Sequence, residues 1–178
     1  MTRYALIYGG LAGLIVIVTI VAGTAMADAD TNLAGAEWMG YLVMLVALSL
    51  VFVGIKRYRD QQREGYIGFW GAAGMGASIA IVAGVIYVFV WEIYLYTSDY
   101  QFMEQYAASV IAESEADGMT GTELEELKLE MDKMSERYAS PLFRLPMTFL
   151  EIFPVGLLIS LISAAFLRRI RPPRLYED

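Results

Sequence analysis

The segment from Phe149 to Ala164 reads FLEIFPVGLLISLISA, an apolar run that contains one carboxylate, Glu151, and one proline, Pro154. Between Arg144 and Arg168, Glu151 is the only charged residue. A helix needs about 20 consecutive apolar residues to cross the hydrocarbon core of a bilayer. The run is therefore long enough to span a membrane, with Glu151 inside that span.

Three other stretches have no charged residue at all. They lie between Arg3 and Asp28, between Glu37 and Lys56, and between Glu64 and Glu92. The 178-residue chain is 57% hydrophobic, whereas soluble domains are usually about 45–50% apolar. We therefore expect an all-α integral membrane protein, a single membrane domain over residues 1–178. Its four transmembrane helices are predicted at about 4–27, 38–55, 67–94 and 146–167.

The first apolar run has an alternative interpretation as a signal peptide. Arg3 precedes it, and AMAD at residues 25–28 resembles a cleavage site. The apolar core of a signal peptide is usually about 7–15 residues, and the run from Tyr4 to Ala27 is longer. We expect a retained anchor. Cleavage after Ala27 is the alternative, which sequencing of the mature N-terminus would reveal.

The chain contains no Cys and no His. This composition excludes disulfides, thiolate nucleophiles, and the zinc and haem sites that depend on those side chains. It also excludes Ser-His and Cys-His catalytic arrangements. We therefore expect no cofactor, no metal site and no enzymatic activity.

Basic residues predict the orientation in the membrane. Nine of the thirteen fall on one side of the predicted spans, before the first, in the loop KRYRDQQREG at residues 56–65, and after the fourth. Lysines and arginines near helix ends mark the cytoplasmic side. Both termini and this loop are thus predicted to be cytoplasmic. We expect the basic residues to contact membrane lipids and not nucleic acid.

Residues 98–140 form an acidic insert that is too long for a simple connection. The insert has eleven carboxylates, from Asp99 to Glu136. Its second half repeats apolar residues at the spacing of a coiled coil over two heptads. This predicted seam consists of Leu124, Leu127, Met131, Met134 and Tyr138.

The segment ADGMTGT at residues 116–122 divides the insert into two helical halves. We therefore expect an extramembrane antiparallel helical hairpin between the third and fourth spans, in the periplasm of a cell with two membranes. Its first helix could continue directly from the third span. The two apolar seams either pack on each other, or one of them pairs with a partner protein or a second copy of the chain.

Small residues recur at four-residue spacing within the spans, as in helices whose backbones approach closely. Gly9 and Gly13 lie in the first span. The predicted helix-packing rows in the third and fourth spans are Gly76, Ala80 and Gly84, and Gly156, Ser160 and Ala164.

A candidate polar intramembrane site lies at the outer ends of the third and fourth spans. With about 1.5 Å of rise per residue, Glu151 falls about one turn inside the outer boundary and Glu92 about one turn outside it. Arg144 lies on the same side, and Pro154 withdraws a backbone donor from the helix. Glu151 is expected either to bond Arg144 or a tyrosine, or to mark a kinked, partly hydrated entrance.

Two segments carry a resemblance to a known family. They are SPLFRLPMTFLEIFPVGLLISLISAAFLRR at residues 140–169 and FVGIKRYRD at residues 52–60. Together with the amphipathic insert, they make the chain similar to a bacterial membrane family known as domain of unknown function 4199. The resemblance covers nearly the whole chain. It implies four spans with a helical insert between the third and fourth, and it implies no activity.

Two functional hypotheses follow. The first is a non-enzymatic inner-membrane protein whose acidic outer hairpin docks onto a membrane or periplasmic partner or forms a homo-oligomer. The alternative is a small transport or ion-conducting component that uses Glu151 and Glu92 at an outer vestibule.

Overall fold

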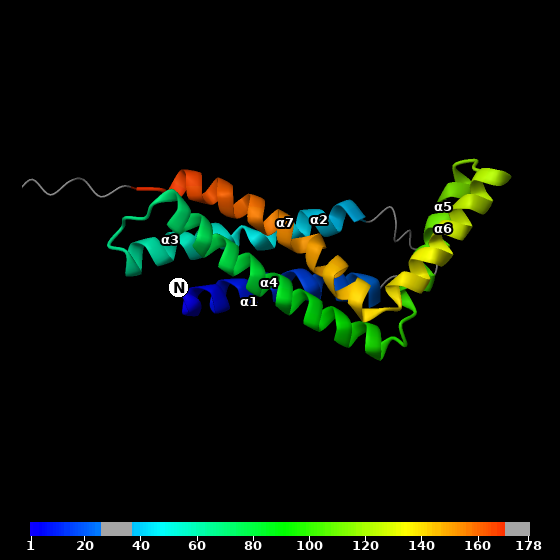
Figure 1. Cartoon of the computed structure of the whole chain (residues 1–178), viewed down its shortest axis with the longest axis horizontal. Helices are drawn as coiled ribbons and strands as arrows, with labels where there is room; N and C mark the ends of the chain where they lie inside the picture. The colour runs from blue at the N-terminus through cyan, green and yellow to red at the C-terminus, as the bar shows by residue number, and fades with distance from the viewer. Residues whose placement is uncertain (26–36, 170–178) are drawn as a thin grey trace, which may run out of the picture.

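The computed structural model describes residues 1–25 and 37–169, which form helices joined by short turns (Figure 1). The helices are α1 (Thr2–Ala25), α2 (Glu37–Leu48), α3 (Leu50–Gln62), α4 (Phe69–Thr97), α5 (Phe102–Ala116), α6 (Thr122–Tyr138) and α7 (Pro141–Leu167). The described residues contain no β-strand, and their one bridge joins Ile67 to Arg169. The predicted cleavage site after Ala27 and the tail arginines Arg171 and Arg174 lie outside the described residues.

Four helices are long and apolar enough to cross a bilayer, as the sequence predicts, and the all-helical fold class is confirmed for the described residues. They cover Thr2–Gly23, Gly40–Gln62, Phe69–Thr97 and Pro141–Leu167. The second combines α2 and α3, which meet at Ser49. Ser49 Oγ donates to the Val46 carbonyl oxygen at this interruption.

The second helix is longer than predicted, because residues 56–62 are helical and not part of a loop. The α3 helix continues past the predicted boundary at Ile55 to Gln62, and the turn follows at Arg63. Lys, Arg and Gln are good helix formers. The chain reaches a residue suited to a turn only at Gly65, where φ is +83°.

The α5 helix is not a continuation of α4. Asp99 and Tyr100, in the turn between them, have φ values of +51° and +58°. Backbone in this left-handed region cannot extend a right-handed helix. Figure 1 shows the resulting change of direction at the end of α4.

Helix α4 packs closely against α1 on one side. A Cβ atom added at Gly9 would lie 2.6 Å from the Ile79 carbonyl oxygen, and one at Gly13 would lie 2.6 Å from that of Ala83. Both carbonyls belong to the backbone of α4. The two backbones are therefore as close as glycine permits, which is how small residues join helices in a membrane.

On its other side, α4 packs against α7 through the two predicted rows of small residues. A Cβ atom added at Gly76 would lie 2.6 Å from Ser160 Cβ, and one at Gly156 would lie 2.7 Å from Ala80 Cβ. Farther along, Gly84 accommodates the ring of Phe149. Ala164 is fully buried at the end of its row.

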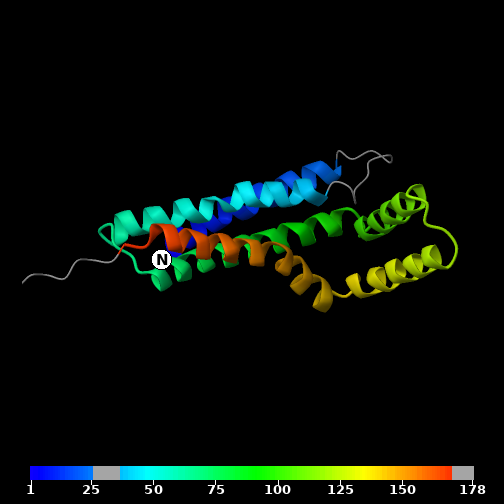
Figure 2. The same cartoon turned by 90° about the horizontal axis from the view of Figure 1, so that it is seen from above.

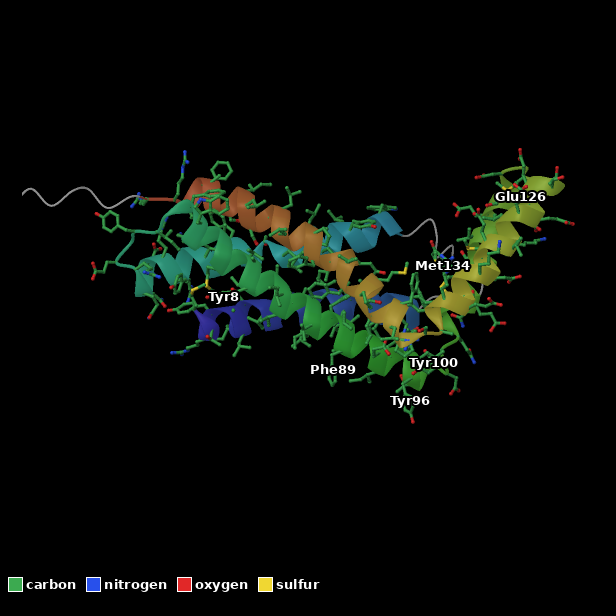
Figure 3. The ribbon with its side chains drawn as sticks, viewed as in Figure 1. Tyr8, Phe89, Tyr96, Tyr100, Glu126 and Met134 are labelled. Atoms are coloured by element: carbon green, nitrogen blue, oxygen red, sulfur yellow. The ribbon has the colours of Figure 1, made fainter. Side chains whose placement is uncertain are left out.

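The outward surface of the four long helices is apolar. Phe89 is 64% exposed, and Figure 3 shows it pointing away from α4, as does Tyr96. Trp70 and Phe166 are exposed to 81% and 80%. So large an apolar surface is unusual for a protein in water, and it is suited to contact with lipid.

We predict that Gly13→Ala destabilises the protein by about 1–3 kcal/mol, because the new methyl group meets backbone that cannot yield. Gly10→Ala is the matched control, since nothing lies within 4 Å of a Cβ atom there. The control should be neutral or slightly stabilising. The measurement is unfolding of each variant by a denaturing detergent titrated into mixed micelles. Equal stability of the two variants would contradict the close contact of α1 with α4.

Candidate functional site

Arg144, in the first turn of α7, forms the most extensive polar contact in the described part of the chain. Its side chain is only 3% exposed. Its Nε donates to Glu92 Oε1 over 2.7 Å, and its Nη2 donates to Glu92 Oε2 over 2.8 Å. This two-pronged geometry is the strongest pairing available to a guanidinium and a carboxylate. It joins the C-terminal part of α4 to the start of α7.

The same guanidinium also holds the end of α6. Nη1 donates to the carbonyl oxygens of Tyr138 over 2.9 Å and of Ala139 over 3.3 Å. A cation is favoured at a helix C-terminus, where carbonyl groups have no partner in the helix. The Arg144 guanidinium carbon lies 5.1 Å from the ring centre of Tyr100 and 5.7 Å from that of Tyr138. Arg144 thus connects α4, α6, α7 and the turn after α4.

Tyr138 makes a second connection between α6 and α4. Its hydroxyl accepts a 2.8 Å hydrogen bond from Trp91 Nε1. Burial raises the pKa of the Tyr138 phenol above its usual value, so the phenol stays neutral at physiological pH. The Trp91 ring also contacts Phe102 edge-on, with 4.8 Å between ring centres. The first residue of α5 and the last residue of α6 therefore meet at one tryptophan.

Beyond this base, α5 and α6 contact each other and extend away from the bundle (Figures 1 and 2). We call residues 102–138 the arm. Lys128 Nζ and Glu115 Oε1, 3.1 Å apart, form an exposed ion pair between its helices.

The arm buries little of its apolar surface. No residue of α5 is buried within Phe102–Ala116, and Tyr138 is the one buried residue of α6. The other four predicted seam residues, Leu124, Leu127, Met131 and Met134, are half-buried. Leu129, which the predicted seam does not include, is 53% exposed.

Glu151 belongs to a different polar contact. Of the two kinds of partner expected for it, the structure shows a tyrosine: the Tyr87 hydroxyl donates to Glu151 Oε2 over 3.0 Å. Arg144 forms its ion pair with Glu92 instead. Sequence reasoning placed Glu92 and Arg144 at similar depth but did not pair them. The sequence signal for this pairing was that Glu92 lies near the C-terminal end of its helix and Arg144 at the N-terminal end of the next span.

Glu151 lines an open groove of about 660 Å³ between α2 and α7. The described lining residues are Tyr41, Leu142, Phe143, Pro146, Met147, Leu150, Glu151, Pro154 and Val155. Pro154 lies inside α7, and Figure 2 shows that α7 bends along its length, as expected for a helix with an internal proline. Glu92 is absent from this lining, so the groove contains only one of the two carboxylates predicted to share a site.

Basic residues lie at the end of the bundle opposite the arm, where the N-terminus also lies (Figure 1). Arg59 Nη1 donates to the Leu167 carbonyl oxygen over 3.2 Å, and Arg63 Nε donates to the Tyr58 hydroxyl over 3.1 Å. Backbone hydrogen bonds between Ile67 and Arg169 join the turn after α3 to the end of α7. The positive end and the acidic arm therefore lie at opposite ends of the molecule.

Residues 1–25 and 37–169 contain no group of three or more acidic side chains placed to hold a metal ion. The polar features at the arm end of the bundle thus include the Arg144–Glu92 pair, the Tyr87–Glu151 contact and the charged surface of the arm.

A family model described as protein of unknown function (DUF4199) matches residues 3–169. The chain belongs to this family. No curated protein and no solved structure matches the chain. The description of this family assigns no activity to its members.

We predict that Arg144→Gln destabilises the protein by about 3 kcal/mol or more, because it leaves Glu92 and two carbonyl groups without their cation. A double-mutant cycle with Glu92→Gln should give a coupling energy of about 1–3 kcal/mol. The measurement is again unfolding in mixed micelles.

The exposed Lys128–Glu115 pair is the matched control for this cycle. Its side chains are 46% and 49% exposed, so the corresponding cycle should give less than about 1 kcal/mol. Equal coupling energies for the two pairs would contradict a special role for Arg144.

Proposed function

We propose that this member of the DUF4199 family is a non-enzymatic membrane protein whose α5–α6 arm docks a basic partner protein outside the cytoplasm. The observation that carries the proposal is the arm itself, an acidic helix pair fixed at its base and incompletely covered along its length. The four long helices would serve as the anchor.

The charge distribution supports the orientation. Arg59, Arg63, Arg168 and Arg169 lie at one end of the bundle and the arm leaves from the other. Basic residues favour the cytoplasmic side. Both termini would then be cytoplasmic in a bacterial inner membrane, and residues 98–140 would lie in the periplasm as an extramembrane helical hairpin.

The arm is suited to present a surface, because it is held rigidly at one end only. Arg144 and Trp91 fix the end of α6 against α4 and α7. Figure 3 shows Glu126 near the far end of the arm, with Met134 closer to the bundle. A partner could therefore reach both helices without contact with the membrane-spanning surface.

The arm's surface favours a partner of opposite charge. Between residues 102 and 138 there are ten carboxylates and three basic residues, a net charge of −7. On α6, Leu129 is exposed and lies one helical turn from both Glu126 and Lys133, next to Glu130. Two such arms in contact would repel each other, which disfavours self-association through this face. A helix with an apolar stripe flanked by Lys and Arg would complement it.

A conducting vestibule formed by Glu92 and Glu151 is the weaker candidate. The Glu92 carboxylate is neutralised by Arg144, and only Glu151 lines the groove among the described residues. Conduction would require a pathway that uses Glu151 alone.

We predict that the arm and the α3–α4 turn lie on opposite sides of the membrane. The absence of native cysteines makes single-cysteine labelling free of background. A membrane-impermeant thiol reagent should label Asp117→Cys in intact spheroplasts. It should label Gln62→Cys only after the membrane is permeabilised. The reverse pattern would overturn the proposed orientation.

We predict that a photocrosslinking amino acid at position 129 forms a defined adduct in living cells. Charge reversal by Glu126→Lys with Glu130→Lys should reduce this adduct about tenfold or more, because it repels a basic partner. Glu104→Lys, an exposed carboxylate on α5, is the control and should leave the adduct intact.

The mass of the crosslinked species distinguishes the possible partners. An adduct of twice the chain mass would mean self-association and would contradict a basic partner. A discrete heteromeric adduct that both charge-reversal variants leave unchanged would also contradict the proposal.

A further inference from the structure

We propose that a groove along α3 binds an anionic phospholipid, with the lipid phosphate against Lys56 and Arg57. We call it the α3 groove. It has a volume of about 420 Å³, and its described lining consists of Phe52, Val53, Lys56, Arg57, Asp60 and Gln61. The inference depends on the membrane location of α3 but not on the docking role of the arm.

The α3 groove lies at the depth where a bilayer changes from hydrocarbon to headgroups. Arg59 Nη1 donates to the Leu167 carbonyl oxygen, so Arg59 lies near the end of the apolar part of α7. Lys56 comes three residues earlier in α3, about 4.5 Å closer to the middle of the bundle. Long basic side chains at such a depth extend toward water, which brings their charged groups beside lipid phosphates.

The deeper part of the groove suits an acyl chain. Phe52 and Val53 precede Lys56 and Arg57 by four residues each, so each apolar side chain lies one turn deeper on the same face of α3. Both are exposed on the surface of the bundle. A phospholipid bound there would present its phosphate to the two cations and its hydrocarbon chain to the two apolar side chains.

The two cations of the groove are available to a ligand. Asp60 is the one acidic residue in the described lining, and its carboxylate is bound by Arg59, with 2.7 Å between Nε and Oδ1. None of the ion pairs in the described part of the chain includes Lys56 or Arg57, and both side chains are exposed. The groove therefore carries a net positive charge, which favours an anionic headgroup over a zwitterionic one.

Gln61 supplies a neutral donor beside the cations. Its Oε1 accepts a 2.8 Å hydrogen bond from the Tyr4 hydroxyl, an arrangement that leaves the amide NH2 group to donate. Gln61 follows Arg57 by four residues and therefore lies on the same face of α3. The Tyr4 ring also contacts the Tyr58 ring edge-on, with 5.7 Å between ring centres. The start of α1 thus holds the Gln61 amide in place beside the groove.

The test is native mass spectrometry of the purified full-length protein with three dioleoyl lipids that differ only in headgroup. Wild-type protein should retain phosphatidylglycerol about tenfold more strongly than phosphatidylethanolamine or phosphatidylcholine, which corresponds to about 1.4 kcal/mol. Lys56→Gln with Arg57→Gln should abolish this preference, because it removes both cations from the groove.

Arg3→Gln with Arg168→Gln is the matched control. It removes the same amount of charge from exposed residues at the start of α1 and the end of α7, and neither residue belongs to the described lining. The control should keep the preference for phosphatidylglycerol. An equal loss in both double variants would mean that the positive end of the bundle attracts anionic lipid without a specific site, and it would overturn the proposal.

A third variant keeps the test decisive if Lys56→Gln with Arg57→Gln does not fold. Val53→Trp leaves both cations in place and fills the deeper part of the groove, so it should reduce the retention of phosphatidylglycerol about tenfold. Equal retention of the three lipids by wild-type protein would overturn the proposal, as would full retention by Val53→Trp. Displacement of phosphatidylglycerol by an equimolar amount of glycerol phosphate would show that a soluble phosphate ester, and not a lipid, is the ligand.

Discussion

The contact of α4 with α1 and α7 determines where the other elements of this protein lie. In lipid, helices gain little from hiding apolar side chains, because the surrounding solvent is equally apolar. The helices are instead held by close contact, and here Gly9, Gly13, Gly76 and Gly156 allow that contact on both sides of α4. The C-terminal end of α4 and the N-terminal end of α7 are thereby brought together. Arg144 can reach Glu92 only because of this arrangement.

The ion pair at that end then positions the arm. A buried pair rarely stabilises a protein more than apolar residues of the same size would, because both charges lose their water. The contribution of the Arg144–Glu92 pair here is to fix the relative positions of three helices. The guanidinium binds a carboxylate of α4 and two carbonyl groups at the end of α6 at the same time. The direction of the arm is thus fixed by contacts that only an arginine at this position can make simultaneously.

The sequence predicted the helices well but the pairing of polar residues poorly. Gaps between charged residues were enough to find the four helices that could span a membrane, because lipid excludes charge over about 20 residues. The end of α3 was missed because the charged residues from Lys56 onward favour a helix as much as a loop. The sequence left open whether the first helix of the insert continues from the third span, since neither Asp99 nor Tyr100 is as typical of left-handed backbone as glycine is. Whether Arg144 would pair with Glu92 or Glu151 depended on the relative rotation of α4 and α7, which periodicity does not reveal.

Two carboxylates at similar depth thus have different surroundings, and the difference has a physical origin. Glu92 extends from the outermost turns of α4 toward α7, where the first turn of that helix supplies a cation. Glu151 comes two turns later in α7, past the residues that meet the end of α6, and lies beside the groove that separates α7 from α2. There, it accepts a hydrogen bond from the Tyr87 hydroxyl and lies beside a largely apolar wall. The same helix therefore holds the arm at its first turn and, two turns later, places a second carboxylate in a separate polar contact.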